Sequence, residues 1–241
     1  MIRFIAQTTL GLILLSLLLV TAYRFLPAPF TPLMAIRGAE KEDPSQRSIE
    51  YKWKDLSAIS GNMQLAVVCS EDQNFVLHNG IDFVAMEKAY KHNKKGKKIR
   101  GASTISQQTA KNLFLWPSRN YVRKAVELYF TGLMELTWTK RDIMQAYLNI
   151  IELGDGVYGI DAASNRYFKK TAQELSRTDA ALMAVLLPAP LKYSALKPGP
   201  FVRKRQLWVL TQMNHFSNEM TYDKAEFLYK LDKLNGGSGK K

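Results

Sequence analysis

One stretch near the start of the chain is hydrophobic without interruption. Residues 4–23 contain no charged side chain, are rich in Leu and Ile, and lie between Arg3 and Arg24. A helix of this length spans the hydrocarbon core of a bilayer. A cleaved signal peptide is the alternative, because residues 20–22 resemble a small-residue cleavage site, although the uncharged run is long for one. The pattern favours an uncleaved transmembrane anchor over residues 1–24, and the flanking charges do not decide its orientation.

The segment that follows the anchor has no hydrophobic period. Pro27, Pro29 and Pro32 interrupt regular structure, and residues 41–47 are polar. We therefore expect residues 25–50 to be a linker that joins the anchor to a folded domain.

From residue 55 onward, apolar positions recur at the spacing of an α-helix. Thr139 is a typical N-cap, and Thr171 with Glu174 forms a capping-box pattern. Further helices are predicted over 178–187, where Pro188 ends the run, and over 203–216 and 222–234. No run of alternating strand residues is convincing, so the fold class is mainly α. Two apolar helix faces are predicted: Val122, Ala125, Val126, Tyr129, Phe130, Leu133 and Met134, and then Ile143, Met144, Tyr147, Leu148 and Ile151.

Composition changes this picture in two respects. The 241 residues carry a net charge of +13 with a pI near 9.7, which suits a polyanionic partner such as nucleic acid, an anionic membrane surface or a phosphorylated substrate. Lys91 to Arg100 concentrates this charge, either as a solvated loop or as a binding strip for anionic headgroups or pyrophosphate. Because it lacks interleaved aromatic residues, it argues against nucleic acid. Cys69 is the single cysteine of the sequence, so an intrachain disulfide is ruled out, and we expect its side chain to be a small buried hydrophobe.

Three polar segments carry candidate chemistry. Glu71 and Asp72 end the apolar run 65–69, where partial burial raises a carboxyl pKa towards general acid/base use, although most such pairs are solvated surface charges. Residues 101–112 are dense in hydroxyl and amide groups suited to sugars and phosphates. Around Glu127, the cations Arg119, Arg123 and Lys124 form either a salt-bridge ladder or a clamp for a pyrophosphate.

Together these segments resemble the peptidoglycan glycosyltransferases that polymerise lipid II, the lysozyme-like family 51. The resemblance covers residues 55–216 and rests on five blocks in order. The blocks are Glu71-Asp72-x-x-Phe75-x-x-His78-x-Gly80; Gly101-Ala102-Ser103-Thr104-Ile105-x-Gln107-Gln108-x-x-Lys111-Asn112; Arg119-x-x-x-Arg123-Lys124-x-x-Glu127; Tyr147-Leu148-Asn149 with Gly154; and Leu187-Pro188-Ala189-Pro190.

The resemblance implies a large lysozyme-like lobe and a smaller membrane-proximal lobe within residues 51–217, followed by a C-terminal helix and flexible tail at 218–241. It implies that Glu71 is the general base and Glu127 the second catalytic carboxylate, while Asp72, Phe75 and His78 are structural. Transfer would invert the donor MurNAc carbon and release undecaprenyl pyrophosphate. Substrate would be bound by Ser103, Thr104, Gln107, Gln108, Lys111, Arg119, Arg123, Lys124 and Asn149.

The same resemblance implies a bacterial inner-membrane protein with a single-pass anchor and a periplasmic catalytic domain. Its expected partners are lipid II, the growing glycan strand and cell-wall synthesis proteins, with no nucleic acid. No cofactor is required for certain, and a divalent cation, Mg or Mn, at the pyrophosphate is left open. Residues 113–117 are either core or a contact with membrane lipid.

Two features depart from the family or point elsewhere. Tyr193 is followed by Ser194-Ala195 instead of the family's Asn-Pro or Asp-Pro step. Residues 194–197 match the S-x-x-K pattern of transpeptidases, but the companion motifs are missing, so we expect glycosyl transfer only. A lytic glycosidase would use water as acceptor and need no pyrophosphate clamp, and a non-catalytic scaffold for cell-wall assembly is the other alternative.

Overall fold

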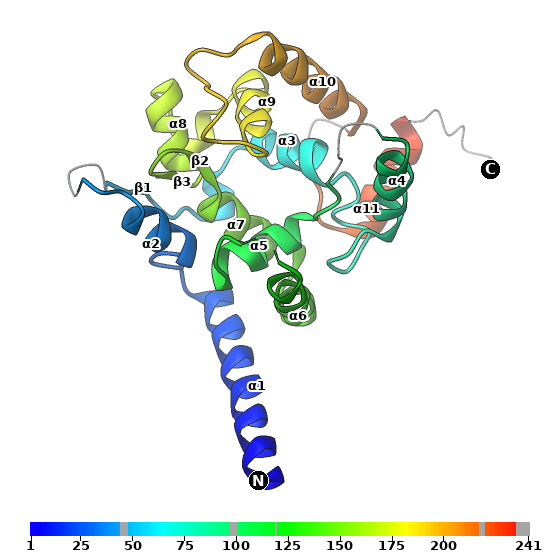
Figure 1. The fold of residues 1–241 in the computed structure, drawn as a ribbon. Helices are drawn as coiled ribbons and strands as arrows, with labels where there is room; N and C mark the ends of the chain where they lie inside the picture. Colours follow the sequence, from blue (N-terminus) through cyan, green and yellow to red (C-terminus); the bar gives the residue numbers. More distant parts are fainter. Residues whose placement is uncertain (44–47, 97–100, 119, 217–219, 235–241) are drawn as a thin grey trace, which may run out of the picture.

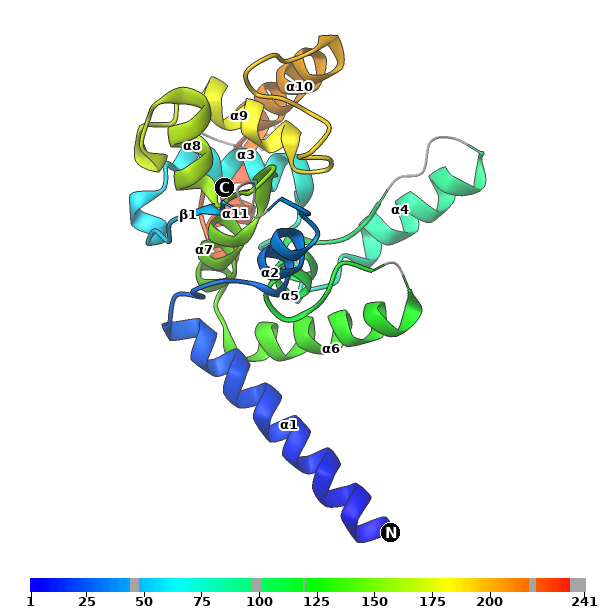
Figure 2. The ribbon, with the colours of Figure 1, turned by 60° about the vertical axis from the view of Figure 1, so that its left-hand side comes forward.

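The structure is a computed structural model that describes residues 1–43, 48–96, 101–118, 120–216 and 220–234, with side chains as far as residue 230. Figures 1 and 2 show a helical body from which one long helix projects. The mainly α prediction is confirmed. The helices are α1 (Ile2–Phe25), α2 (Pro32–Ala39), α3 (Gly61–Glu71), α4 (Phe83–Lys94), α5 (Ile105–Phe114), α6 (Tyr121–Thr137), α7 (Lys140–Ile150), α8 (Ile160–Phe168), α9 (Arg177–Leu186), α10 (Pro200–Phe216) and α11 (Lys224–Leu234), with short 3₁₀ turns η2 (Leu56–Ala58) and η3 (Ala172–Glu174).

Helix α3 lies at the centre of the core. Seven consecutive residues from Met63 to Cys69 are buried, so this helix is covered on all sides, with α9 and α10 packed against it. Ser60 caps its first turn, and Gln64 inside it donates hydrogen bonds to the carbonyls of Leu56 and Ile59. The buried position predicted for Cys69 is confirmed. A helix enclosed in this way holds its last residue, Glu71, at a defined place.

Several predicted helix boundaries are confirmed by their caps. Thr139 caps α7 through a capping box with Asp142, and Thr171 forms the predicted box with Glu174, although the element it begins is only the turn η3. Helix α9 begins one residue before the predicted start, after an N-cap at Ser176. The apolar face predicted for α7 is buried in full.

A small three-stranded sheet lies beside α8. The strands are β1 (Glu50–Tyr51), β2 (Glu152–Gly154) and β3 (Val157–Tyr158), in the order β1-β3-β2, with β1 parallel and β2 antiparallel to β3. Tyr158 pairs with Tyr51 on one side and with Glu152 on the other. These strands are too short for periodicity to reveal them, and they connect the segment before the domain to its interior.

Residues placed in a linker from the sequence contain an ordered helix. Pro32 occupies the first turn of α2, where a proline has no hydrogen bond to lose, and the buried Thr31 caps it by accepting from the amide of Met34. Met34 itself is buried. The expectation that prolines exclude regular structure over 25–50 is therefore wrong at α2, and this helix borders the cleft described below.

Helix α1 projects from the body and is joined to it at its C-terminal end (Figure 1). It is 24 residues long and apolar enough to cross a membrane. The indole of Trp138 donates to the carbonyl of Val20 at 2.9 Å, the hydroxyls of Ser16 and Tyr129 are 2.6 Å apart, and Arg24 pairs with Asp142 at 3.2 Å. The anchor is thus attached to α6 and to the start of α7.

The apolar face predicted for α6 is buried only towards its end, where Met134 is buried and Phe130 and Leu133 pack against the core. Val122 and Tyr129 are exposed, whereas Arg123, Glu127 and Thr131 are buried. Helix α6 lies on the same side of the body as α1 in both views (Figures 1 and 2), so its exposed apolar side chains continue the apolar surface of the anchor. Periodicity located the hydrophobic stripe correctly, but the polar stripe faces the protein.

Gly159 provides a test of the packing between the sheet and α7. Its φ is +77°, and an added Cβ would lie 2.4 Å from the carbonyl oxygen of Asn149. We expect Gly159→Ala to lower the free energy of unfolding by about 2–4 kcal/mol through strain and overlap. Thermal denaturation in detergent measures this change in stability.

Gly132→Ala is the matched control, because a Cβ there meets nothing within 4 Å in the middle of α6. It should raise stability by roughly 0.5–1 kcal/mol through helix propensity. Equal stability of the two variants would contradict the packing described here.

Candidate active site

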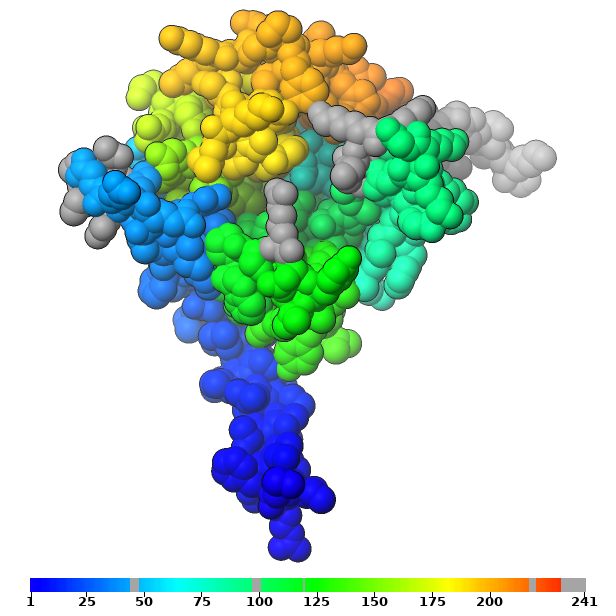
Figure 3. All heavy atoms as spheres, in the orientation of Figure 1, coloured from blue at the N-terminus to red at the C-terminus, as the bar shows by residue number. Residues whose placement is uncertain are grey.

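A cleft of about 590 Å³ lies between the end of α3, helix α5, the start of α6 and the segment after α9. Figure 3 shows the surface hollowed between the yellow residues after α9 and the green residues around the start of α6, with α2 in blue at one side. Its lining is polar and charged on most sides. The lining residues are Leu33, Arg37, Glu71, Ser103, Gln107, Gln108, Lys111, Asn112, Leu115, Trp116, Pro117, Ser118, Arg123, Lys124, Glu127, Tyr147, Ile151, Glu152, Leu187, Pro188 and Pro190.

Glu71 is the last residue of α3 and reaches this cleft from the core. Burial raises its pKa, while hydrogen bonds from Gln108 and Ser70 oppose that change. The amide of Gln108 donates to Glu71 Oε2 at 3.1 Å, and the hydroxyl of Ser70 donates to Oε1 at 3.2 Å. A carboxylate with a raised pKa and fixed orientation is suited to accept a proton.

The amide of Gln108 is oriented by a second contact. The buried Tyr147 donates from its hydroxyl to Gln108 Oε1 at 3.3 Å, which leaves the NH₂ group of that amide facing Glu71. Tyr147 comes from α7, Gln108 from α5 and Glu71 from α3. Three helices therefore fix the direction in which the Glu71 carboxylate accepts hydrogen bonds.

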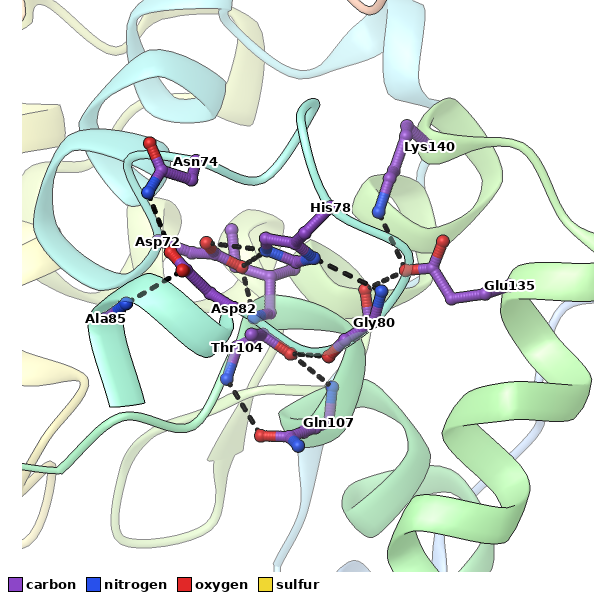
Figure 4. A network of polar contacts seen from close by, with 12 residues as sticks. Asp72, Asn74, His78, Gly80, Asp82, Ala85, Thr104, Gln107, Glu135 and Lys140 are labelled. Atoms are coloured by element: carbon purple, nitrogen blue, oxygen red, sulfur yellow. Dashed lines mark hydrogen bonds and ion pairs between the residues drawn. The ribbon is translucent and has the colours of Figure 1, made fainter. Parts of the chain in front are cut away.

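Asp72 joins α3 to α5 instead of entering the cleft. Its carboxylate accepts from His78 Nε2 at 2.9 and 3.1 Å and from the backbone amide of Ile105, the first residue of α5, at 2.9 Å (Figure 4). The amide of Gly80 donates to His78 Nδ1 at 3.1 Å, so Nε2 carries the proton given to Asp72. These contacts agree with the structural roles expected for Asp72 and His78, and Phe75 is buried in the core.

The loop after α3 is also attached to α5 and α6. Thr104 caps α5 and donates from its hydroxyl to the carbonyl of Gly80 at 2.6 Å, as Figure 4 shows. Gly80 has a φ of +86°, and a Cβ there would lie 2.7 Å from Thr131 on α6. Glu135, also on α6, accepts from Ser106 and pairs with Lys140 at 2.7 Å. These contacts fix α6 relative to Glu71.

Glu127 is the second carboxylate of the cleft and is 3% exposed. Arg123 donates to its Oε2 and Lys124 to its Oε1, so each oxygen has a cation. These three residues face the cleft because the polar stripe of α6 is turned inward. A buried carboxylate needs such partners, since an unpaired buried charge is strongly destabilising.

Lys111 approaches the same carboxylate from α5. Burial lowers its pKa, Glu127 raises it, and the neighbouring cations Arg123 and Lys124 lower it further. Three cations therefore gather around Glu127, and their excess positive charge is available to an anion that enters the cleft. Oxygens of a phosphate or diphosphate match this arrangement.

The part of the chain that forms the cleft is similar to known proteins. Residues 40–214 match the family model described as transglycosylase. The chain belongs to the transglycosylase family. The match begins at residue 40, so α2, which ends at Ala39, lies just before it.

Several curated proteins called biosynthetic peptidoglycan transglycosylase are similar over most of their length. One from Haemophilus influenzae is 48% identical over 83% of this chain and 83% of its own. One from Caulobacter vibrioides is 45% identical over 84% and 90%, and one from Shewanella oneidensis is 43% identical over 92% and 94%. The chain is therefore a peptidoglycan glycosyltransferase, as the sequence blocks implied.

Most of the residues predicted to bind substrate or carry catalysis line the cleft. They are Glu71, Glu127, Ser103, Gln107, Gln108, Lys111, Arg123 and Lys124. Gln107 also completes the capping box of α5, because its Oε1 accepts from the amide of Thr104. Arg119 lies outside the described residues.

Two predicted binding residues are absent from the cleft lining and make hydrogen bonds within the fold. Thr104 is 2% exposed and caps α5. Asn149 is 1% exposed, accepts from the amide of Lys54 at 2.7 Å and donates to the carbonyls of Lys54 and Gln145. Both side chains are occupied away from the cleft, because backbone groups of neighbouring segments would otherwise be buried without partners.

The hydrophobic segment 113–117 is buried only in part. Leu113 and Leu115 are buried in the core, whereas Trp116 is 45% exposed at the cleft. Phe114 stacks on Phe130 at 4.7 Å between ring centroids and lies 6.0 Å from the ring of Tyr23 on the anchor. The segment therefore connects the cleft with the side of the molecule on which the anchor lies.

Sequence reasoning missed Arg37 and Glu152 in the cleft. Arg37 belongs to α2, in the supposed linker, and Glu152 follows the Tyr147-Leu148-Asn149 block. The i, i+4 spacing of Leu33 and Arg37 was the one available signal, and it acquires meaning only once α2 is known to border the cleft.

The residues at the cleft do not form a metal site by themselves. Over the described ranges, no group of three or more His, Cys, Asp or Glu side chains is placed to hold an ion. Both oxygens of Glu127 already have cationic partners. A divalent cation there would take ligands from the substrate's own diphosphate.

Asn149→Ala separates a structural role from a binding role. Loss of the amide leaves the buried backbone groups of Lys54 without partners, so we expect stability to fall by about 2–4 kcal/mol. The KM for lipid II should stay unchanged in the folded protein. Thermal denaturation and steady-state kinetics at low temperature measure the two effects. A raised KM at unchanged stability would restore the binding role.

Proposed function

We propose that Glu71 is the general base of lipid II polymerisation and that the cluster around Glu127 binds the departing diphosphate. The observation that carries this proposal is the pairing of a carboxylate of raised pKa with three cations in one cleft. Glu71 removes the proton from the 4-hydroxyl of the acceptor GlcNAc as that oxygen bonds to C1 of the donor MurNAc. The bond from C1 to the phosphate oxygen breaks, and its electron pair leaves with undecaprenyl diphosphate.

The cations supply what the leaving group requires. Negative charge develops on the bridging phosphate oxygen, and prearranged cations stabilise it without further reorganisation. Lys111, Arg123 and Lys124 take this part, with Arg119 following from the sequence block. Glu127 orients Arg123 and Lys124 through its two oxygens and limits the repulsion among them. Attack from the face opposite the leaving group converts the α linkage to β.

A lytic glycosidase is the alternative of the same general fold. It would direct water at the glycosidic carbon and would have no use for a buried cation cluster. The cleft therefore favours transfer from a lipid-linked donor.

The S-x-x-K pattern of residues 194–197 lies in an exposed turn. Ser194 is exposed, and its hydroxyl accepts from the amide of Lys197 at 3.3 Å.

The location we propose is the bacterial cytoplasmic membrane, with α1 as a single-pass anchor and the catalytic domain on the periplasmic face. Support comes from the apolar surface of α1 and from the exposed apolar side chains of α6 next to it. The partners that follow are lipid II, the growing glycan strand and other proteins of cell-wall synthesis. The cleft then lies close to the surface that carries its lipid substrate.

Glu71→Gln tests the base directly. We expect at least a 100-fold loss of polymerisation, because the amide accepts no proton, with lipid II binding nearly unchanged. The assay follows polymer and free carrier lipid, whereas shortened glycan would indicate a hydrolase. Glu87→Gln, at an exposed carboxylate paired with Lys91, is the control and should retain full activity. Near-normal turnover by Glu71→Gln would refute the assignment.

The same variant should be more stable than the wild type at neutral pH. Burial raises the pKa of Glu71 in the folded protein, so its favourable contribution exists below the unfolded pKa and is lost as pH rises through the folded value. At neutral pH the ionised carboxylate destabilises the fold, and Gln removes that cost. A higher Tm of the variant also shows that lost activity is not lost folding.

The pH dependence of kcat/KM provides an independent test. A base of raised pKa loses activity as pH falls through a value above that of an ordinary glutamate. Gln108→Leu removes a hydrogen bond that favours the ionised form, so the acid limb should move to higher pH. Gln73→Leu is the control, because Gln73 donates to Cys69 and Gln212 and not to Glu71. An acid limb at the same pH in both variants would contradict the role of Gln108.

A further inference from the structure

Arg37 is a cation of the cleft wall that comes from outside the domain's sequence blocks. It lies on α2 one turn after Leu33, and both side chains line the cleft. The helix that carries it is held firmly, because Thr31 and Met34 are buried and Thr31 caps the first turn. The helix also packs against α5, so Arg37 has a defined position in the cleft lining.

The partners of Arg37 are few and loosely bound. It donates to Glu40 at 3.1 Å, but this i, i+3 pair is exposed at the surface, where such pairs contribute little. Its Nε lies 3.5 Å from Glu152 Oε1, and this buried Nε–H has no hydrogen-bond partner. A guanidinium has five donors in a planar fork. Within the part of the chain that the structure describes, Glu40 accepts from one of them and the Nε–H beside Glu152 has no acceptor, which is unusual for a buried donor.

Glu152 connects Arg37 with the phosphate-binding cations. Its side chain is 10% exposed, it lies against Arg37, and its charge acts on Lys111. Burial raises the pKa of Glu152, and Arg37 lowers it. One carboxylate thus acts on two cations of the cleft, Arg37 from α2 and Lys111 from α5. The positive field that extends from Lys111 to Arg37 is wide enough to involve α2 in holding an anion.

We propose that Arg37 is a substrate-binding residue that donates to the diphosphate of the lipid-linked donor. The inference rests on the proposed function of the cleft and adds a contact from the segment that joins the anchor to the domain. A diphosphate oxygen would accept hydrogen bonds from the guanidinium N–H groups that Glu40 and Glu152 leave available. The anchor and the clamp then act on the same part of the substrate, its lipid side and its diphosphate.

The test uses the full-length protein in detergent with purified lipid II, and undecaprenyl diphosphate as a competing product. Arg37→Gln should raise the KM for lipid II on the order of 10-fold with little change in kcat, because a charged hydrogen bond made throughout the reaction is lost. The Ki of undecaprenyl diphosphate should rise by the same factor. Arg37→Lys keeps the charge but not the planar fork of donors, so its KM and Ki should lie between those of the wild type and Arg37→Gln.

Lys41→Gln is the matched control, since Lys41 lies on the same segment, pairs with Asp155 at 2.9 Å and is absent from the cleft lining. Its KM should match the wild type. Glu152→Gln distinguishes substrate binding by Arg37 from a role in which Arg37 only holds Glu152. If Arg37 binds substrate, this variant should have a lower KM for lipid II. A raised KM in Glu152→Gln equal to that in Arg37→Gln would overturn the proposal, because Arg37 would then only hold Glu152.

A raised KM with an unchanged Ki would also overturn the proposal and place the contact on a carboxylate of the peptide stem. Lys111→Ala distinguishes failure of the further inference from failure of the proposed function. If Lys111→Ala raises both constants and Arg37→Gln raises neither, only Arg37 is wrongly assigned. If neither variant raises either constant, the diphosphate clamp itself is refuted.

Discussion

The arrangement of the cleft depends on the carboxylate of Asp72. It joins the C-terminal end of α3 to the first amide of α5, and His78 completes its hydrogen bonds. The preceding residue, Glu71, is the proposed base, while α5 carries Gln108 and Lys111. A negative charge at a helix N-terminus is favourable, so the contact also stabilises α5. The position of the base relative to its hydrogen-bond donor is thus set by a neighbour that does no chemistry.

Around this contact, the site separates two electrostatic environments. Glu71 sits at the end of an apolar helix, where burial favours its protonated form, whereas Glu127 sits between the cations Arg123 and Lys124. Two carboxylates in one cleft can therefore have different tasks. The Ser106, Glu135 and Lys140 contacts behind the cleft hold α6 against α5 and keep these environments apart.

The sequence located the main helices and most of the cleft residues, but not all of the residues that line the cleft. Helix periodicity and caps located α7 and α9, and the sequence blocks identified most of the cleft, because each block lies on a single helix or loop. Thr104 and Asn149 belong to those blocks yet serve the fold, since a motif records which residues occur together and not which of them face a ligand. Arg37 lies outside every block and reaches the cleft only through the path of the chain.

Local patterns were sufficient for the helical class and the apolar N-terminal helix, because each follows from side-chain type and spacing within one segment. Glu71 and Glu127 were singled out only by the resemblance of the ordered blocks to a family, and the fold brings both to one cleft. The buried face of α6 required the whole fold. Its hydrophobic stripe continues the surface of the anchor, so the polar stripe with Arg123 and Glu127 is turned into the protein. Burial depends on what surrounds a helix, and contacts between segments far apart in sequence, such as those of Arg37 with Glu152, have no local signature.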